Sequence, residues 1–237
     1  MQDALAAKGV KTALVRVKKV VEHFNHSQLD SQQLKVKQKQ LDLPPHCLIQ
    51  DVVTRWNSTL DMASWLCEQQ AAIAAVLHGK RDLHHLELSP QEWHILEDLI
   101  KLLEPFRNAT KVLSGQKYPT LSCLGPILAD LKEKLADDPQ DSTTTKSAKQ
   151  AMRIDFSGRY KDSDVLDLMN KAAFLDPRFK ILAHLSASTV EDITMLIQRE
   201  IVNLLQQDSP EVDQSTESIT DQRNEVHERG RTCLIQC

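Results

Sequence analysis

Apolar residues recur in this chain at the spacing of an α-helix, and no other feature of the sequence constrains the fold as strongly. Val10, Leu14, Val17, Val21 and Phe24 lie three or four positions apart, which places them on one face of a helix. Patterns of the same kind predict further helices, at residues 28–41, 57–77, 90–113, 121–135, 144–160, 163–174 and 188–206. The chain is therefore expected to bury the apolar faces of many helices against one another.

Strands are expected to be rare. The 237 residues include 6 glycines, and aromatic residues make up 4% of the chain, whereas strand-rich folds use more of both in turns and in cross-strand pairs. The run CLIQDVV at residues 47–53 is the segment that most favours an extended conformation. We predict a mainly α fold with at most one or two vestigial strands.

Two capping boxes are expected to start helices. Ser89 precedes Pro90 and lies three residues before Glu92, so its hydroxyl can accept a backbone N–H while the glutamate reaches back to the cap. Ser188 and Glu191 have the same spacing. Both pairs predict well-defined helix starts.

Four weaker local signals complete the helix prediction. Asn57 or Ser58 is a candidate N-cap for the helix that is predicted to reach residue 77. Residues 78–88 are predicted to be a polar loop, and Pro105 is expected to kink the helix that contains it. The segment 137–145 is predicted to be a polar linker.

The first 40 positions are basic within a chain whose net charge is −4. Lys11, Arg16, Lys18 and Lys19 lie outside the apolar face of the first predicted helix. A solvated helix face is one interpretation of this charge. A weak electrostatic contact with the phosphates of DNA is the other.

The segment DVVTRWNST, at residues 51–59, combines a guanidinium, a large aromatic ring and small polar side chains. Arg55 can clamp a phosphate with its planar fork, and the ring of Trp56 offers a face on which an unpaired base can stack. The alternative is structural, with Trp56 as a core anchor and Asn57 or Ser58 as the helix cap. The residues alone leave both interpretations open.

Motifs for catalysis, cofactors or metals are missing from the sequence. There is no glycine-rich phosphate loop, no H-E-x-x-H and no C-x-x-C pair. His78, His84, His85 and His94 follow no regular ligand spacing, so they are expected to be solvated histidines rather than metal ligands. We predict no catalytic residue, no metal site and no cofactor, and therefore a protein that is not an enzyme.

The cysteines and the hydropathy profile indicate the compartment. The 5 cysteines are odd in number and widely scattered, which favours reduced thiols in the cytosol or nucleus. No apolar run is long enough for a signal peptide or a membrane span. A membrane partner is therefore not expected.

Three blocks of this sequence resemble the hAT superfamily of DNA transposases, and in particular the BED-type zinc-finger proteins domesticated from them. The blocks are IQDVVTRWNSTLDM around residues 51–62, LEDLIKLLEPFRNATKVLSGQKYPTLS at 96–122, and AAFLDPRFK at 172–180. They occur in the family's order and at plausible separations. The resemblance covers roughly residues 1–205.

The resemblance implies a ribonuclease-H-like core that is interrupted by an all-helical insertion. It divides the chain into a remnant of the core at 1–56, a helical insertion-type domain at 57–206 and a disordered tail at 207–237. The family's zinc finger, its three catalytic carboxylates and its dimerisation block find no match in the chain. Arg55 and Trp56 match an Arg-Trp pair that lies near the transposon-end DNA in the family.

Two functions follow as expectations. The first is a catalytically inactive, nuclear and DNA-associated fragment of a transposase-like protein, with Arg55, Trp56 and the basic residues of the first helix as DNA contacts. The second is a helical scaffold that binds a protein partner and no nucleic acid. Its support is the net negative charge and the acidic second half of the chain.

Overall fold

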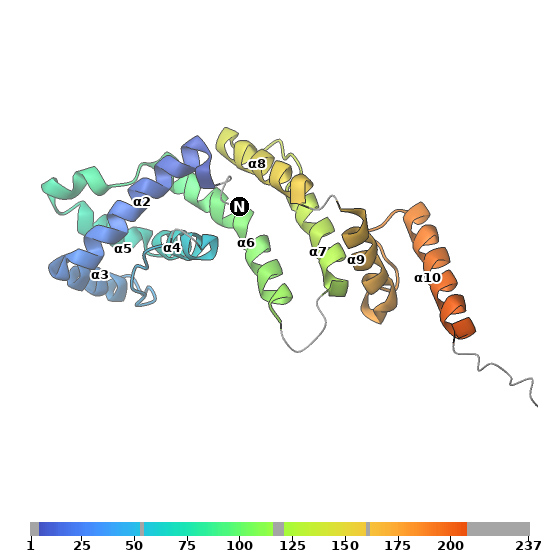
Figure 1. Cartoon of the computed structure of the whole chain (residues 1–237). Helices are drawn as coiled ribbons and strands as arrows, with labels where there is room; N and C mark the ends of the chain where they lie inside the picture. The colour runs from blue at the N-terminus through green and yellow to red at the C-terminus, as the bar shows by residue number, and fades with distance from the viewer. Residues whose placement is uncertain (1–4, 53–54, 116–120, 160–161, 208–237) are drawn as a thin grey trace, which may run out of the picture. The chain divides into compact units, whose positions relative to one another are not determined.

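A computed structural model describes residues 5–52, 55–115, 121–159 and 162–207 of the chain (Figure 1). The described residues are mainly helical and include no strand, which confirms the predicted mainly α fold. Residues 47–52 are irregular, and Val53 lies outside the described residues. The predicted tail also lies outside them, apart from residue 207. No helix in the described part of the chain is long and apolar enough to cross a membrane.

The chain divides into two compact units, residues 1–186 and 187–237. The first unit contains α2 (Lys8–His26), α3 (Gln28–Gln40), α4 (Trp56–Glu68), α5 (Gln70–Leu77), the 3₁₀ helix η1 (Arg81–Leu86), α6 (Pro90–Leu113), α7 (Leu121–Lys134), α8 (Thr143–Arg159), α9 (Ser163–Leu175) and the 3₁₀ helix η2 (Pro177–Phe179). The described part of the second unit contains α10 (Ala187–Gln207).

The core of the first unit forms around α6, which contacts α2, α4, α7 and α8 (Figure 1). The apolar face predicted for α2 is buried along its whole length, at Val10, Leu14, Val17, Val21 and Phe24. Together with apolar residues of α4, α5 and α6 these side chains form one hydrophobic cluster. The packing is continuous across residue 56, where the resemblance places a boundary between two regions. That boundary stays a prediction about the family's architecture.

The capping box at Ser89 is confirmed, whereas the other two predicted caps are wrong. The Ser89 hydroxyl accepts the Glu92 N–H, and the Glu92 carboxylate accepts the Ser89 N–H at 2.7 Å. Helix α4 begins at Trp56, with Arg55 rather than Asn57 or Ser58 in the N-cap position. Helix α10 begins at Ala187, which places Ser188 inside its first turn.

The hydroxyl of Ser58 does not cap the helix but bonds to the backbone that precedes it. It donates to the carbonyl of Arg55 at 2.6 Å and accepts the N–H of Val52 at 2.8 Å. It therefore links the irregular segment before α4 to the first turn of that helix. The local pattern could not show this bond, because it depends on the turn that precedes the helix.

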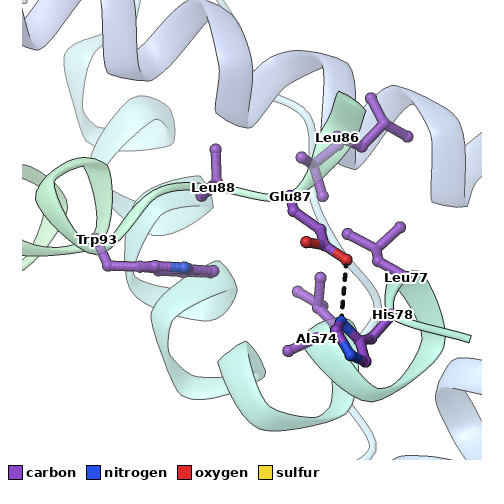
Figure 2. A pocket seen from close by; sticks show the side chains of 9 residues that line it. Ala74, Leu77, His78, Leu86, Glu87, Leu88 and Trp93 are labelled. Carbon is purple, nitrogen blue, oxygen red and sulfur yellow. Dashed lines mark ion pairs between the residues drawn. The ribbon is translucent and has the colours of Figure 1, made fainter. Parts of the chain in front are cut away.

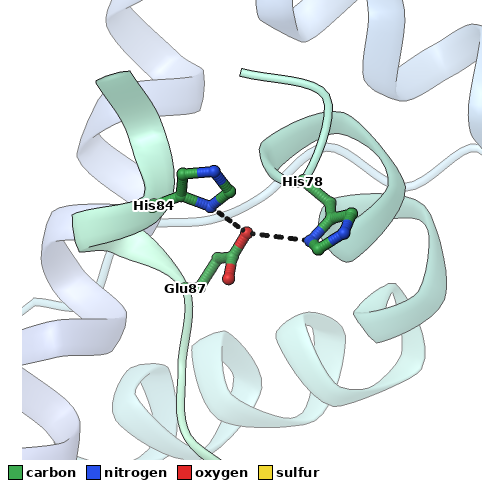
Figure 3. Close-up of side chains that lie close together, drawn as sticks. All are labelled: His78, His84 and Glu87. Carbon is green, nitrogen blue, oxygen red and sulfur yellow. Dashed lines mark hydrogen bonds and ion pairs between the residues drawn. The ribbon is translucent and has the colours of Figure 1, made fainter. Parts of the chain in front are cut away.

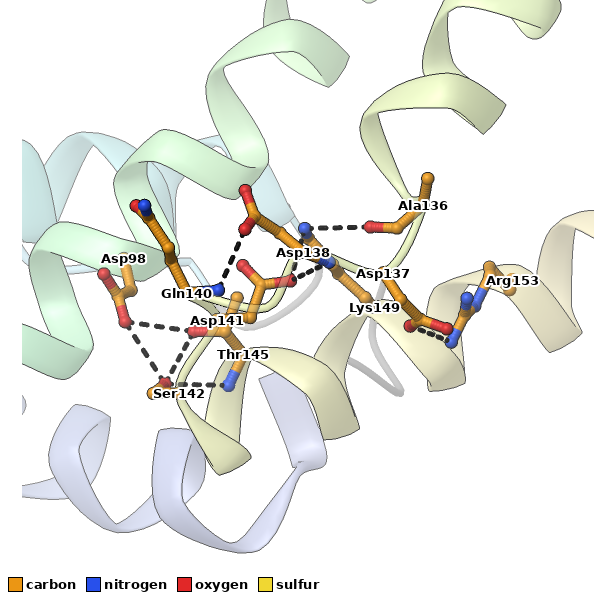
Figure 4. A network of polar contacts seen from close by, with 10 residues as sticks. All are labelled: Asp98, Ala136, Asp137, Asp138, Gln140, Asp141, Ser142, Thr145, Lys149 and Arg153. Atoms are coloured by element: carbon orange, nitrogen blue, oxygen red, sulfur yellow. Dashed lines mark hydrogen bonds and ion pairs between the residues drawn. The ribbon is translucent and has the colours of Figure 1, made fainter.

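Two segments predicted to be irregular are more ordered than their polarity suggested. Residues 78–88 contain η1, whose Leu83 and Leu86 are buried in the core. In the predicted linker, Ser142 Oγ and Thr145 Oγ1 both donate to the Asp98 carboxylate of α6, at 3.2 and 3.0 Å (Figure 4).

Pro105 lies inside α6, which is continuous from Pro90 to Leu113. The kink expected at this residue stays a prediction.

A polar junction ties together two of the blocks that carry the family resemblance. Ser122, at the end of the second block, donates its hydroxyl to Asp176 of the third block at 2.6 Å. Arg178 pairs with the same carboxylate at 2.6 Å, and the carboxylate also accepts the Arg178 N–H at the start of η2. The Arg178 guanidinium, together with the Ser122 hydroxyl, holds the pKa of Asp176 well below its ordinary value. The sequence D-P-R of the third block is thus used to join α7 and α9.

We expect Asp176→Asn to reduce the acid sensitivity of the fold. A carboxyl whose pKa is lower in the folded state than in the unfolded chain stabilises the fold above its unfolded pKa of about 3.9. This stability is lost as the pH falls through the folded pKa. The variant should therefore lose less stability than the wild type below about pH 4.

Urea unfolding at a series of pH values measures this difference. Asp82→Asn, which changes an exposed carboxylate, is the matched control and should follow the wild-type curve. If Asp176→Asn and the wild type lost stability equally steeply as the pH falls, the stabilising role of the ionised Asp176 would be contradicted.

Candidate nucleic-acid interface

The six residues predicted to contact DNA lie on two neighbouring elements, α2 and the start of α4. A shallow pocket of about 220 Å³ between them is lined by Lys11 and Lys18 of α2, by Asp51 before α4 and by Thr59 in its first turns. Asp51 and Thr59 flank Arg55 in the sequence. The tertiary structure therefore brings Lys11 and Lys18 of the basic helix beside Asp51 and Thr59 of the DVVTRWNST segment, although Lys18 and Asp51 are 33 positions apart in the sequence.

Lys18 has a structural partner at this junction. Its ammonium lies 2.9 Å from Asp51 Oδ2, and Thr59 Oγ1 lies 3.3 Å from the same oxygen. The Asp51 side chain is only 5% exposed, so the lysine balances a nearly buried charge. This pair fixes the segment before α4 to α2 and leaves Lys18 less available for phosphate.

Arg16 is also engaged by its own fold. Its Nε lies 2.8 Å from Glu92 Oε1, and its guanidinium donates to the carbonyl of Glu87. Glu92 is the residue that completes the capping box of α6. The contact therefore attaches α2 to the N-terminus of α6, and its first role is structural.

Lys11, Lys19 and Arg55 are exposed, and no acidic side chain in the described part of the chain pairs with them. Arg55 occupies the N-cap position of α4, where its backbone N–H donates to Val52 at 2.7 Å. The backbone bond holds the start of the side chain while the guanidinium stays in solvent. These three cations are the ones that the fold leaves open to a phosphate.

Trp56 is divided between the core and the surface. It is the first residue of α4, and its half-buried ring packs against the main hydrophobic cluster. This packing supports a core role for part of the ring. Stacking on a base stays a prediction for the part that is exposed.

Cys67 is unsuited to nucleophilic chemistry. Burial, with a smaller contribution from the Glu97 carboxylate, raises the pKa of Cys67 to about 12. Such a thiol stays protonated and unreactive at neutral pH. Cys47 and Cys123 are also free cysteines.

The sequence analysis set His78 and His84 aside as solvated histidines and did not consider Glu87 beside them. His78, His84 and Glu87 converge at the end of α5 and on η1, with their donor atoms within 4.8 Å of one another (Figure 3). His85 hydrogen-bonds to a backbone carbonyl instead, and His94 lies beside acids of its own helix. The spacing H-x5-H-x2-E was visible in the sequence, but it is not a recognised ligand motif. Only the 3₁₀ turn of η1 brings the three residues together.

Comparison with known proteins confirms the resemblance. Residues 1–102 match the family model described as ZBED1 RNase-like helical domain. The chain is 29% identical to zinc finger BED domain-containing protein 4 of Homo sapiens over 177 residues, which are 72% of this chain and 14% of that protein. It is 28% identical to an AC transposase of Zea mays over 183 residues, which are 76% of this chain and 22% of that protein. No solved structure matches the chain.

The matches connect the three blocks of the sequence with the observed fold. The chain spans about a seventh and about a fifth of the length of these two relatives. The helical description of the matched domain agrees with the described helices of residues 1–102. The chain is thus similar to BED-type zinc finger proteins and to transposases of the hAT superfamily, and its first 102 residues match the model of an RNase-like helical domain.

Proposed function

We propose that this chain is a DNA-associated, catalytically inactive relative of hAT transposases that acts in the nucleus. The observation that carries the proposal is the exposure of Lys11 and Lys19 on α2, next to the segment that presents Arg55. Cations that are not neutralised by the protein itself can release counterions from DNA when they meet its phosphates. The names of the two relatives, a zinc finger protein and a transposase, support a role on DNA.

The pairing of three aspartates with separate cations supports the proposal that this chain alone is not catalytic. Asp51, Asp61 and Asp176 lie within the blocks of family resemblance, and each has its own cation. Asp51 pairs with Lys18, Asp61 with Arg107 of α6, and Asp176 with Arg178. Two-metal cleavage of DNA needs carboxylates that converge on shared ions. Three carboxylates neutralised by three different cations are used for structure.

We expect Lys11→Ala with Lys19→Ala to weaken DNA binding and to flatten its dependence on salt. Each lost phosphate contact lowers the slope of log affinity against log salt by about 1, so the double variant should lower it by about 2. The loss should be similar for every DNA sequence, because phosphate contacts carry no sequence information. Fluorescence anisotropy with a duplex at several salt concentrations measures the slope.

Lys111→Ala with Lys132→Ala is the matched control, because both lysines are exposed and lie on α6 and α7 rather than α2. The control should keep the wild-type slope. Equal slopes in both double variants would place the DNA contact elsewhere.

A helical scaffold that binds a protein and no nucleic acid is the second candidate. It is favoured by the net charge of −4 and by the exposed apolar side chains of α10, which include Met195, Ile201, Leu204 and Leu205. The salt titration separates the two functions. A wild-type chain without measurable duplex affinity at low salt would leave the scaffold as the function.

A further inference from the structure

Two imidazoles and one carboxylate face one another between the end of α5 and the end of η1 (Figure 3). Glu87 Oε1 lies 2.9 Å from His84 Nδ1 and 3.5 Å from His78 Nδ1. The two rings meet edge to face with their centroids 5.9 Å apart. All three side chains therefore direct a metal-binding atom at one small volume.

Backbone hydrogen bonds and buried neighbours fix the main chain at these residues. The N–H of His78 donates to Ala74 at the last turn of α5, and the N–H of Glu87 donates to the carbonyl of His84 at the end of η1. The carbonyl of Glu87 accepts the guanidinium of Arg16 from α2. Leu83 and Leu86 anchor η1 in the core. The backbone that carries the three ligands is thus anchored, which limits the entropy lost when a ligand is bound to the ordering of the side chains.

We propose that His78, His84 and Glu87 form a binding site for a divalent transition metal ion of the Zn²⁺ class. Two histidines with one glutamate are a known ligand set for zinc, with Zn–N and Zn–O distances of about 2.0–2.2 Å. Neighbouring ligand atoms of a tetrahedral ion then lie about 3.3 Å apart. The two distances to Glu87 already bracket this value. The ligand nitrogens of the two imidazoles lie at most 4.8 Å apart, and rotation of the exposed rings brings them closer.

The surroundings of the site are suited to a partly open coordination sphere. His78 and Glu87 form the polar edge of an apolar pocket of about 160 Å³, whose other walls include Leu77, Leu88 and Trp93 (Figure 2). The His78 side chain is 85% exposed, so an ion can enter from solvent. With three protein ligands, at least one position is left for water or for a small ligand, as in zinc sites that are not purely structural.

The ordinary alternative is a pair of hydrogen bonds from two histidines to one glutamate. Metal titration of the full, reduced chain separates it from the proposal. Co²⁺ serves as the spectroscopic probe, and Zn²⁺ is measured by calorimetry. We expect one ion to bind with nitrogen and oxygen ligands and without the sulfur-to-cobalt charge-transfer band of a cysteine site. His78→Ala and His84→Ala should each weaken Zn²⁺ binding at least about tenfold.

His94→Ala is the matched control, because His94 is exposed on α6 and has Glu97 and Asp98 within 3.8 and 4.0 Å but no second imidazole. It should bind Zn²⁺ as the wild type does. Glu87→Gln keeps the shape of the side chain and removes the anionic ligand, so it should weaken binding without unfolding the chain; circular dichroism checks the fold. Wild-type affinity in His78→Ala and His84→Ala, or the absence of any saturable binding by the wild type, overturns the proposal.

Discussion

Asp141→Ala is expected to lower the free energy of unfolding by about 3 kcal/mol. Asp141 Oδ2 lies 2.6 Å from the ammonium of Lys149, and the two side chains are only 14% and 10% exposed (Figure 4). The lysine also donates to the carbonyl of Ala136 at 3.1 Å. Removal of the carboxylate leaves a nearly buried ammonium without its counter-charge, and this is far more destabilising than the loss of a surface pair.

The same loop provides the matched control. Asp137 pairs with Arg153 at 2.9 Å, but the side chain of Asp137 is 71% exposed. Asp137→Ala should therefore change the stability by less than about 1 kcal/mol. Addition of Lys149→Met to Asp141→Ala removes the unpaired charge and should recover part of the loss. Chemical unfolding of the four proteins gives the values. Equal losses in Asp137→Ala and Asp141→Ala would show that the Lys149 pair is as solvated as a surface pair.

Trp56→Ala is expected to lower the free energy of unfolding by about 2 kcal/mol, because its half-buried ring packs against the hydrophobic cluster. If the exposed part of the ring also stacks on an unpaired base, the variant additionally loses the preference for hairpin over duplex DNA. Base stacking on an aromatic ring contributes about 1–3 kcal/mol, so this preference should fall by roughly tenfold or more. Thermal unfolding and competition binding on the same samples measure the two effects.

Two further variants sharpen the result. Trp56→Phe keeps an aromatic ring in the core and should restore most of the stability and part of the preference. Arg55→Ala removes an exposed guanidinium from the N-cap position, so it should weaken DNA binding with little effect on stability. A stability loss in Trp56→Ala with an unchanged hairpin preference would leave Trp56 with a core role alone.

The helices could be predicted because their signals are local. The apolar face of α2 and the capping box at Ser89 depend on residues within one or two helical turns, and the structure shows both. The helix bounds agree with the prediction to within a few residues, except that the predicted helix 57–77 is two helices, α4 and α5, which meet at Gln69. Gln69 is fully buried, and its side-chain amide donates to the carbonyl of Pro44 at 3.0 Å. A local sequence pattern cannot predict this bond, because the partner lies 25 residues away in the chain.

The sequence predicted which residue types could contact DNA, but not which of these side chains stay free of acidic partners in the fold. The sequence singled out the basic residues of the first helix as one set. The fold divides them, because the carboxylates of Asp51 and Glu92 reach Lys18 and Arg16 from other elements. Lys11 and Lys19 meet no such acid in the described residues and stay exposed. Charge pairing between distant segments is a tertiary property, so a charge pattern along one helix cannot reveal it.

By itself, the sequence determined that this chain is helical, roughly where most helices begin and end, and which family it resembles, because these properties are carried by periodicity and contiguous motifs. Only the tertiary structure decided which polar side chains meet. It joined Ser122 to Asp176, placed Lys149 beside Asp141, and turned His78 and His84 toward Glu87. The physical reason is that such contacts need side-chain atoms about 3–4 Å apart. A 3₁₀ turn or the crossing of two helices sets these distances, whereas the spacing of residues in the sequence does not.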